Sequence, residues 1–155
     1  MHSRAGFSLV EILIVLAGMG LLMGVATVSL QGLRERTGVR QAATDYAVIL
    51  RQARTLAQRY NANVTVQLTG LSGGLASGYS LTQVRSSGSV TQTYTMPSGV
   101  RAKAAVSGGE TTLTYQAPYG EVVSTGLSIR FESSRNSSVG VTVGAVGLTG
   151  KVVVY

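Results

Sequence analysis

The chain has 155 residues, enough for one domain, and a formal net charge of +7 although only 12% of its residues are charged. It contains no cysteine, which excludes disulfides, thiolate nucleophiles, cysteine-based metal sites and a lipid attached through cysteine. Its single histidine is His2, and its acidic residues are scattered without metal-ligand or acid–base spacing. We therefore expect neither an enzyme nor a metal or cofactor site.

An apolar stretch covers residues 7–30 and contains a single charge, Glu11. As a helix with about 1.5 Å per residue it is about 36 Å long, enough to cross a bilayer. A carboxylate inside a membrane segment costs free energy, so it usually has a function and a partner. An ordinary secretory signal has a shorter apolar run, and no glutamate interrupts the beginning of that run. A plain single-pass anchor would not require Gly6, Phe7 and Glu11 at this spacing.

A helical pattern continues over residues 39–60, where apolar residues recur at alternating steps of three and four. Polar and basic residues such as Arg40, Arg51 and Arg54 fall on the opposite side. No proline interrupts residues 7–60, so the sequence predicts one helix of about 54 residues. Its predicted buried face consists of Val39, Ala43, Tyr46, Leu50, Ala53, Ala57 and Tyr60.

Beyond residue 60 the apolar period changes to two. Val64, Val66 and Leu68 alternate with polar residues, as in a half-buried strand. Further strands are predicted at 79–84, 89–96, 111–116, 127–132, 139–143 and 151–155, with 100–106 as an additional candidate. Glycine- and proline-rich turns separate them. The predicted fold class is α+β: a long N-terminal helix packs through its second half on an antiparallel sheet or a small β-sandwich.

The order Arg4, Gly6, Phe7, Glu11 resembles the start of type IV prepilins and type II secretion pseudopilins. In that family a prepilin peptidase cuts after the glycine, the new N-terminus is methylated and the glutamate guides assembly. The resemblance implies cleavage between Gly6 and Phe7, methylation of Phe7, and pairing of Glu11 with the Phe7 amine of a neighbouring subunit. It divides the chain into a leader peptide (1–6), a transmembrane and filament-core helix (7–30) and an exported domain (31–155), which includes the amphipathic helix half to about residue 60.

The later sequence resembles one subgroup of that family, the H-type or FimT-like minor pseudopilins. Arg51, Arg54 and Ala57, followed by a strand at Val64, resemble the end of the helix in this subgroup. The C-terminal order of strands, ending in a glycine, a basic residue and valine at 150–153, also resembles it. The predicted function is a structural subunit, a minor pilin or pseudopilin, of a type IV pilus or a type II secretion pseudopilus. Both machines use the same N-terminal chemistry, so the sequence does not distinguish them.

The resemblance also implies partners and a location. The partners are the prepilin peptidase and methyltransferase, other pilin or pseudopilin subunits, and the assembly platform of the inner membrane. The implied location is the inner membrane, which the chain crosses once, with a cytoplasmic N-terminus and a periplasmic or extracellular C-terminal domain. Incorporation into a pilus or pseudopilus follows.

An alternative function is a tip subunit that captures DNA for natural transformation, as FimT-like minor pilins of transformable bacteria do. Removal of the leader takes Arg4 away and leaves a formal charge of +6, and basic surfaces bind phosphates without a sequence code. The arginines on the helix have a simpler explanation as a solvated face. Tyrosines at 79, 94, 115, 119 and 155 would stack on single-stranded bases, although packing on the sheet is their commoner role. The candidate DNA contacts are Arg130, Arg135 and Lys151.

Overall fold

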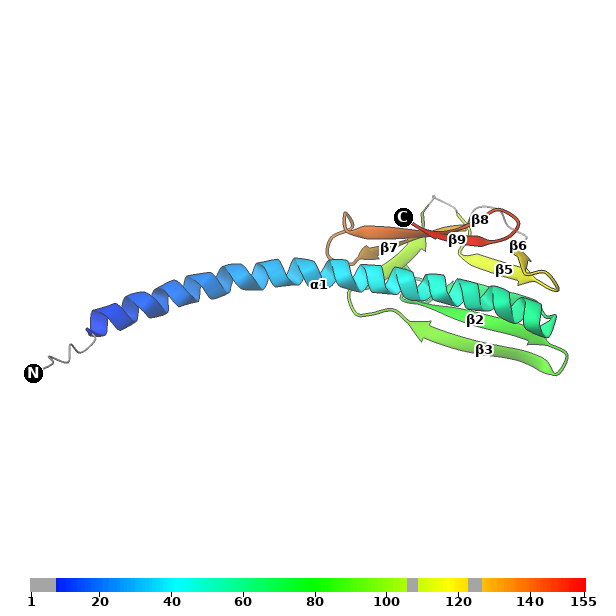
Figure 1. Ribbon diagram of the computed structural model, residues 1–155, viewed down its shortest axis with the longest axis horizontal. Coiled ribbons are helices and arrows are strands. Elements are labelled where there is room, and N and C mark those ends of the chain that lie inside the picture. The colour runs from blue at the N-terminus through cyan, green and yellow to red at the C-terminus, as the bar shows by residue number, and fades with distance from the viewer. Residues whose placement is uncertain (1–7, 106–108, 123–126) are drawn as a thin grey trace, which may run out of the picture. The chain divides into compact units, whose positions relative to one another are not determined.

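The computed structural model describes residues 8–105, 109–122 and 127–155, apart from the side chains of 25–30. The chain forms two compact units, Met1–Arg34 and Glu35–Tyr155. Figure 1 shows the order of the elements, from α1 to β9.

A single helix, α1, runs from Leu9 to Tyr60 and contains 52 residues. It begins after Ser8, whose carbonyl accepts hydrogen bonds from the amides of Glu11 (3.0 Å) and Ile12 (3.3 Å). It ends at Tyr60: the following residue, Asn61, has a φ of 47°, and the Ala62 amide donates back to the Ala57 carbonyl at 3.3 Å. A left-handed residue followed by this backward bond is a common helix terminator. The single long helix expected from the sequence is confirmed.

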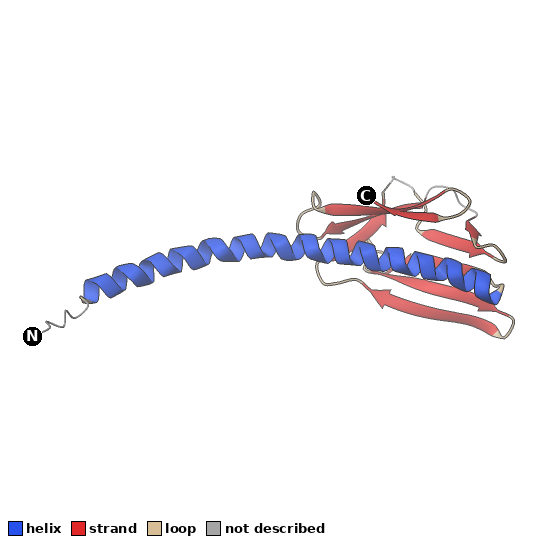
Figure 2. Ribbon diagram, in the orientation of Figure 1, coloured by secondary structure: helices blue, strands red, loops and turns tan. Residues whose placement is uncertain are grey.

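The second unit contains two antiparallel sheets (Figure 2). The five-stranded sheet has the order β3-β2-β1-β5-β6 and comprises β1 (Val64–Thr69), β2 (Gly78–Arg85), β3 (Gly88–Thr95), β5 (Thr112–Gln116) and β6 (Glu121–Val122). The four-stranded sheet has the order β4-β7-β8-β9 and comprises β4 (Val100–Ala104), β7 (Leu127–Ser133), β8 (Gly140–Val146) and β9 (Lys151–Val154). A bridge between Ala76 and Ala102 joins the connection between β1 and β2 to β4 of the four-stranded sheet.

The second half of α1 packs against both sheets and completes one core. The Tyr46 ring shows this directly, because it lies 5.2 Å from the Tyr79 ring of β2 and 5.3 Å from the Phe131 ring of β7. The predicted α+β class is confirmed, and the helix face predicted to be buried is buried with one exception. Tyr60 is 47% exposed. It is the last residue of α1, and its ring instead faces the guanidinium groups of Arg59 (5.6 Å) and Arg85 (5.0 Å).

The strands follow the predicted pattern except at two places. The two-residue strand β6 was not predicted, because a segment this short has no periodicity to detect. Strand β8 continues to Val146, beyond the predicted end at 143, although glycine often interrupts strands. A Cβ atom at Gly144 would lie 3.5 Å from the Tyr155 ring, so the ring of Tyr155, the residue that follows β9, covers this glycine. That contact depends on the pairing of β8 with β9, which the alternation of residues within β8 does not reveal.

The turn between β8 and β9 offers a matched test of packing. Gly147 and Gly150 both have positive φ, 71° and 59°. A Cβ at 147 meets no atom within 4 Å, whereas one at 150 would lie 2.5 Å from Val122 and 2.7 Å from Tyr115. We expect Gly147→Ala to lower the free energy of unfolding by about 1 kcal/mol, the cost of the backbone conformation. Gly150→Ala should cost about 3 kcal/mol, because overpacking is added. Urea unfolding measures both, and equal losses would contradict this account of the turn.

Candidate functional site

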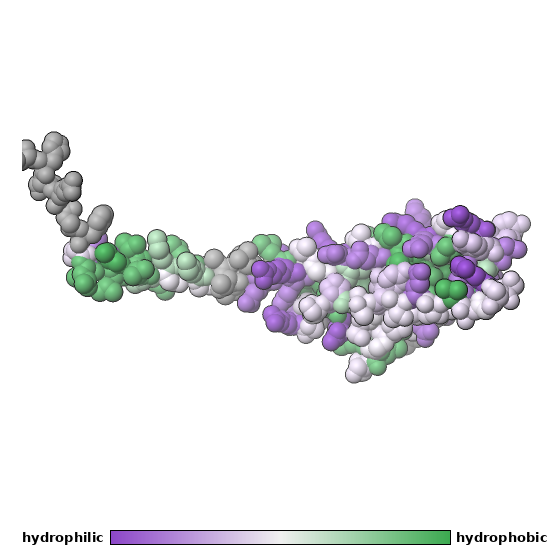
Figure 3. All heavy atoms as spheres, turned by 90° about the horizontal axis from the view of Figure 1, so that it is seen from below, coloured by the Kyte–Doolittle hydropathy of each residue, from purple (hydrophilic) through white to green (hydrophobic). Residues whose placement is uncertain are grey.

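The first half of α1 presents apolar side chains to its surroundings (Figure 3). The large apolar residues between positions 9 and 23 have exposed fractions from 51% to 76%. Contiguous apolar surface of this kind marks contact with another protein or with lipid. In the part of the chain that the structure describes, no helix has the length and mean hydropathy of a membrane span.

Glu11 lies in the first turn of this helix and is exposed. The positive end of a helix favours a carboxylate at this position. Ser8 precedes it by three residues, and a serine followed at this spacing by a glutamate is the sequence pattern of a capping box. This spacing gives Glu11 a second candidate role as a helix-capping residue, which the motif comparison had not identified although the pattern is visible in the sequence. No cation lies within ion-pair distance of Glu11 among the residues described. Gly6 and Phe7 lie outside the described residues.

A basic hollow of about 410 Å³ lies along one flank of the second half of α1. Arg51 and Arg54 of α1 and Lys151 of β9 line it, with Thr55 and Gln58. The hollow places Lys151 of β9 next to residues of α1 on the side of the helix away from Asp45. Burial raises the pKa of the nearby Tyr115 to about 12, and the positive charge of Arg54 opposes that rise. The hollow therefore gathers positive charge from two segments far apart in the sequence.

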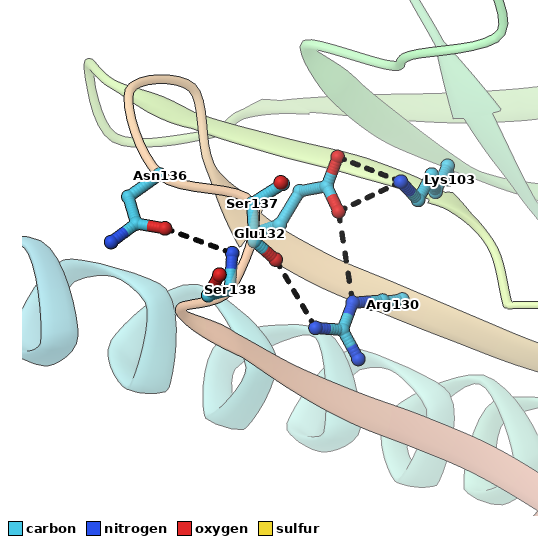
Figure 4. A network of polar contacts seen from close by, with 6 residues as sticks. All are labelled: Lys103, Arg130, Glu132, Asn136, Ser137 and Ser138. Atoms are coloured by element: carbon cyan, nitrogen blue, oxygen red, sulfur yellow. Dashed lines mark hydrogen bonds and ion pairs between the residues drawn. The ribbon is translucent and has the colours of Figure 1, made fainter.

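Arg130 and Arg135 do not join this hollow. Arg130 lies on β7, and its Nε is 3.6 Å from the carboxylate of Glu132. The same carboxylate is 2.8 Å from the Lys103 ammonium and only 8% exposed, so it balances charge from two cations (Figure 4). Arg135 lies exposed in the loop between β7 and β8. In the register of the sheet, Arg130 is opposite Thr142 and Lys151 is opposite Val146, four residues further along β8.

Of the five tyrosines considered for base stacking, some are packed in the core and others are exposed. Tyr79 and Tyr115 are buried, and the ring of Tyr94 stacks on that of Tyr79 at 5.2 Å with an interplanar angle of 18°. Tyr119 and Tyr155 are exposed by 72% and 68%. Only the last two residues are mainly exposed, so packing accounts for most of the set.

Two acidic side chains on the second half of α1, Glu35 and Asp45, have different surroundings. Glu35 accepts a hydrogen bond from the Ser133 hydroxyl at 3.3 Å and so ties α1 to the end of β7. Asp45 lines a second hollow beside β3, on the other flank of α1. Within the described ranges, no group of three or more histidine, cysteine or acidic side chains is placed to hold a metal ion.

One protein-family model, described as type II transport protein GspH, matches residues 42–147. The chain belongs to the GspH family. This match covers more than half of the chain and confirms the H-type resemblance read from the sequence. No curated protein matches the sequence.

Solved structures share the fold of this GspH-family chain. The type IV minor pilin FimU of Pseudomonas aeruginosa, in two crystal forms, matches with TM-scores of 0.57 and 0.59 at 19% identity. The matches cover 75% and 79% of this chain and 91% and 92% of FimU. The minor pseudopilin EpsH of the Vibrio cholerae type 2 secretion system matches with a TM-score of 0.59 at 13% identity, over 76% of this chain and 95% of EpsH. The fold is therefore that of minor pilins and pseudopilins.

Proposed function

We propose that this GspH-family protein is a structural subunit, a minor pilin or pseudopilin, that joins a type IV pilus or a type II secretion pseudopilus through its N-terminal helix. The observation that carries the proposal is the contrast between the two halves of α1. The second half is buried against two sheets, whereas the first half keeps its apolar side chains exposed and has one carboxylate in its first turn. Exposed apolar surface costs about 25 cal/mol per Å² in water, which favours cover by lipid or by other helices.

The same proposal gives the segments of the chain their roles. Residues 1–6 are a leader, and Arg4 keeps it in the cytoplasm by the positive-inside rule. Residues 7–30 anchor the subunit in the inner membrane before assembly and enter the filament core afterwards. Residues 31–155 are the exported domain. The partners are the peptidase and methyltransferase, the assembly platform and other subunits.

In this mechanism Glu11 sets the axial register of assembly. Cleavage after Gly6 would expose the Phe7 amine, which has a reference pKa of about 8 and is mostly protonated at neutral pH. An unpaired charge in a dry filament core is costly. Pairing of Glu11 with the Phe7 amine of a neighbour removes that cost at one axial offset only, while apolar packing supplies the attraction.

The first prediction concerns processing. Mass spectrometry of the mature protein should show a chain that begins at a methylated Phe7. Gly6→Val should block cleavage, because the peptidase cuts after a glycine. Gly18→Ala is the matched control, since a Cβ there meets no atom within 4 Å. Assembled material that still begins at Met1 would refute the assignment.

The second prediction separates the two roles of Glu11. Glu11→Val removes both the charge and the capping residue, whereas Glu11→Gln removes the charge and keeps a side chain suited to a capping box. If charge pairing sets the register, both variants insert into the membrane but incorporate poorly into filaments. Quantitative immunoblots of sheared filaments and membranes measure this. Normal incorporation of Glu11→Gln would show that the residue serves only to cap the helix.

We propose DNA capture as a second function, and the basic hollow is the observation that favours it. Arg51, Arg54 and Lys151 line one depression and offer sequence-independent contacts to phosphates. Arg130 is a weaker candidate than the sequence suggested, because Glu132 balances its charge.

The third prediction tests this second function with variants of equal charge. Arg51→Gln with Lys151→Gln removes two cations of the hollow, and Arg36→Gln with Arg101→Gln removes two elsewhere. Mobility shifts of the full chain in neutral detergent at low salt should show weak DNA binding that falls steeply with salt. The first pair should reduce affinity more than the second. The absence of any shift at tens of micromolar protein, or equal effects of the two pairs, would argue against DNA capture at the hollow.

A further inference from the structure

Strand β3 is the open edge of the five-stranded sheet among the described residues. It pairs with β2 along its whole length, yet seven of its eight residues are exposed. Only Tyr94 packs against the core. Its sequence has no charge and no proline, the devices by which proteins usually protect an edge strand from pairing with another chain. A long edge that adds so little to the core needs another explanation.

The register fixes which main-chain groups of β3 face outward. The Met96 amide donates to the Ser77 carbonyl at 3.0 Å, toward β2. In an antiparallel ladder these directions alternate, so the amides and carbonyls of Thr91, Thr93 and Thr95 point away from β2. The hydroxyl groups of Thr82 and Thr91 lie 3.0 Å apart. This close approach is expected for two residues that face each other across an antiparallel pair without main-chain hydrogen bonds between them. Three consecutive outward positions are therefore ready to pair with a further strand.

A hollow of about 510 Å³ lies beside the end of this edge. Thr93, Tyr94 and Thr95 line it from β3, and Val48 and Asp45 line it from α1. The stacked rings of Tyr79 and Tyr94 form an aromatic pair there, and Val48 is half exposed. An aromatic surface with an adjacent aliphatic wall fits the stem of a long side chain.

The negative charge of Asp45 beside this hollow favours a bound side chain that ends in a cationic group. Asp45 is exposed, and no cation lies within ion-pair distance of it among the residues described. Burial is the main reason why the pKa of Tyr79 is raised to about 12, and the negative charge of Asp45 adds to this rise. The Asp45 carboxylate therefore acts electrostatically on the aromatic pair. A carboxylate beside tyrosine rings attracts an ammonium or guanidinium group and repels phosphates.

We propose that the open edge of β3 and the hollow beside Tyr94, together the β3 groove, bind an extended segment of a partner protein that carries a lysine or arginine side chain. The segment adds as a further strand and pairs with Thr91, Thr93 and Thr95. Its cationic side chain enters between Tyr94 and Asp45. Figure 3 views the molecule from the side on which β3 lies, and pale side chains of intermediate hydropathy dominate the second unit there. The proposal does not depend on filament assembly.

The test uses the full chain in neutral detergent micelles and a short synthetic peptide as the probe. The peptide alternates threonine and valine and has one central lysine. A matched peptide has glutamate in its place, and a third has N-methylated amides along one edge, which prevents strand pairing. Fluorescence anisotropy of labelled peptides measures affinity. We expect the lysine peptide to bind, and the glutamate and N-methylated peptides to bind far more weakly or not at all.

A variant of the protein separates the charge from the strand pairing. Asp45→Asn should weaken binding of the lysine peptide about five-fold, the effect of one partly exposed ion pair. Glu121→Gln removes an exposed acid elsewhere and should leave the affinity unchanged. Both changes are at exposed positions, and thermal unfolding checks that each variant is folded.

Amide hydrogen exchange locates the peptide. Binding should protect the amides of Thr91, Thr93 and Thr95, whereas Gln92 and Tyr94 should change little because their amides already bond to β2. The proposal is overturned if no peptide binds at millimolar concentration, if the lysine and glutamate peptides bind equally, or if the N-methylated peptide binds as well as its parent. Protection without this alternation would also overturn it.

Discussion

The structure depends on the burial of one face of α1 between two sheets. Five alanines of the buried face, at positions 42, 43, 47, 53 and 57, keep the helix backbone close to the strands. Tyr46 and Leu50 supply the bulk between them, and both are fully buried. Because Tyr46 contacts β2 and β7 together, the helix is what makes the two sheets share one core. Interiors packed this closely leave the helix little freedom to rotate.

The fixed rotation of α1 decides the chemistry on its flanks. Successive helix residues are about 100° apart, so Asp45 and Arg54 lie on opposite sides of the buried face. On one flank, arginines of α1 and Lys151 of β9 line the cationic hollow. On the other flank, Asp45 of α1 and Tyr94 of β3 line the acidic, aromatic hollow. A single packing arrangement thus produces two surfaces of opposite charge beside two sheet edges, which suit different partners.

Formal charge is an incomplete guide to the positive surface of this protein. Glu132 is nearly buried between Lys103 and Arg130, so part of the excess positive charge is balanced within the four-stranded sheet. A buried carboxylate is stable only with such partners. Arg85 and Arg59 are similarly engaged on the Tyr60 ring. The cations that line the hollow, Arg51, Arg54 and Lys151, and the exposed Arg135 have no carboxylate partner among the described residues, and counting residues does not identify them.

The sequence determined whatever depends on local periodicity and on contiguous motifs. The three-and-four spacing of apolar residues predicted α1 and most of its buried face, and the alternation after residue 60 predicted most strands. The order of Gly6, Phe7 and Glu11 indicated the family, which the GspH match then confirmed over later residues. Tertiary structure alone decided the rest. It brought Lys151 beside Arg51 and Lys103 beside Glu132, exposed Tyr60 and placed Asp45 next to the open edge of β3. Each of these depends on which strands pair and how the helix is rotated over them, and such long-range contacts leave no periodic signal in the chain.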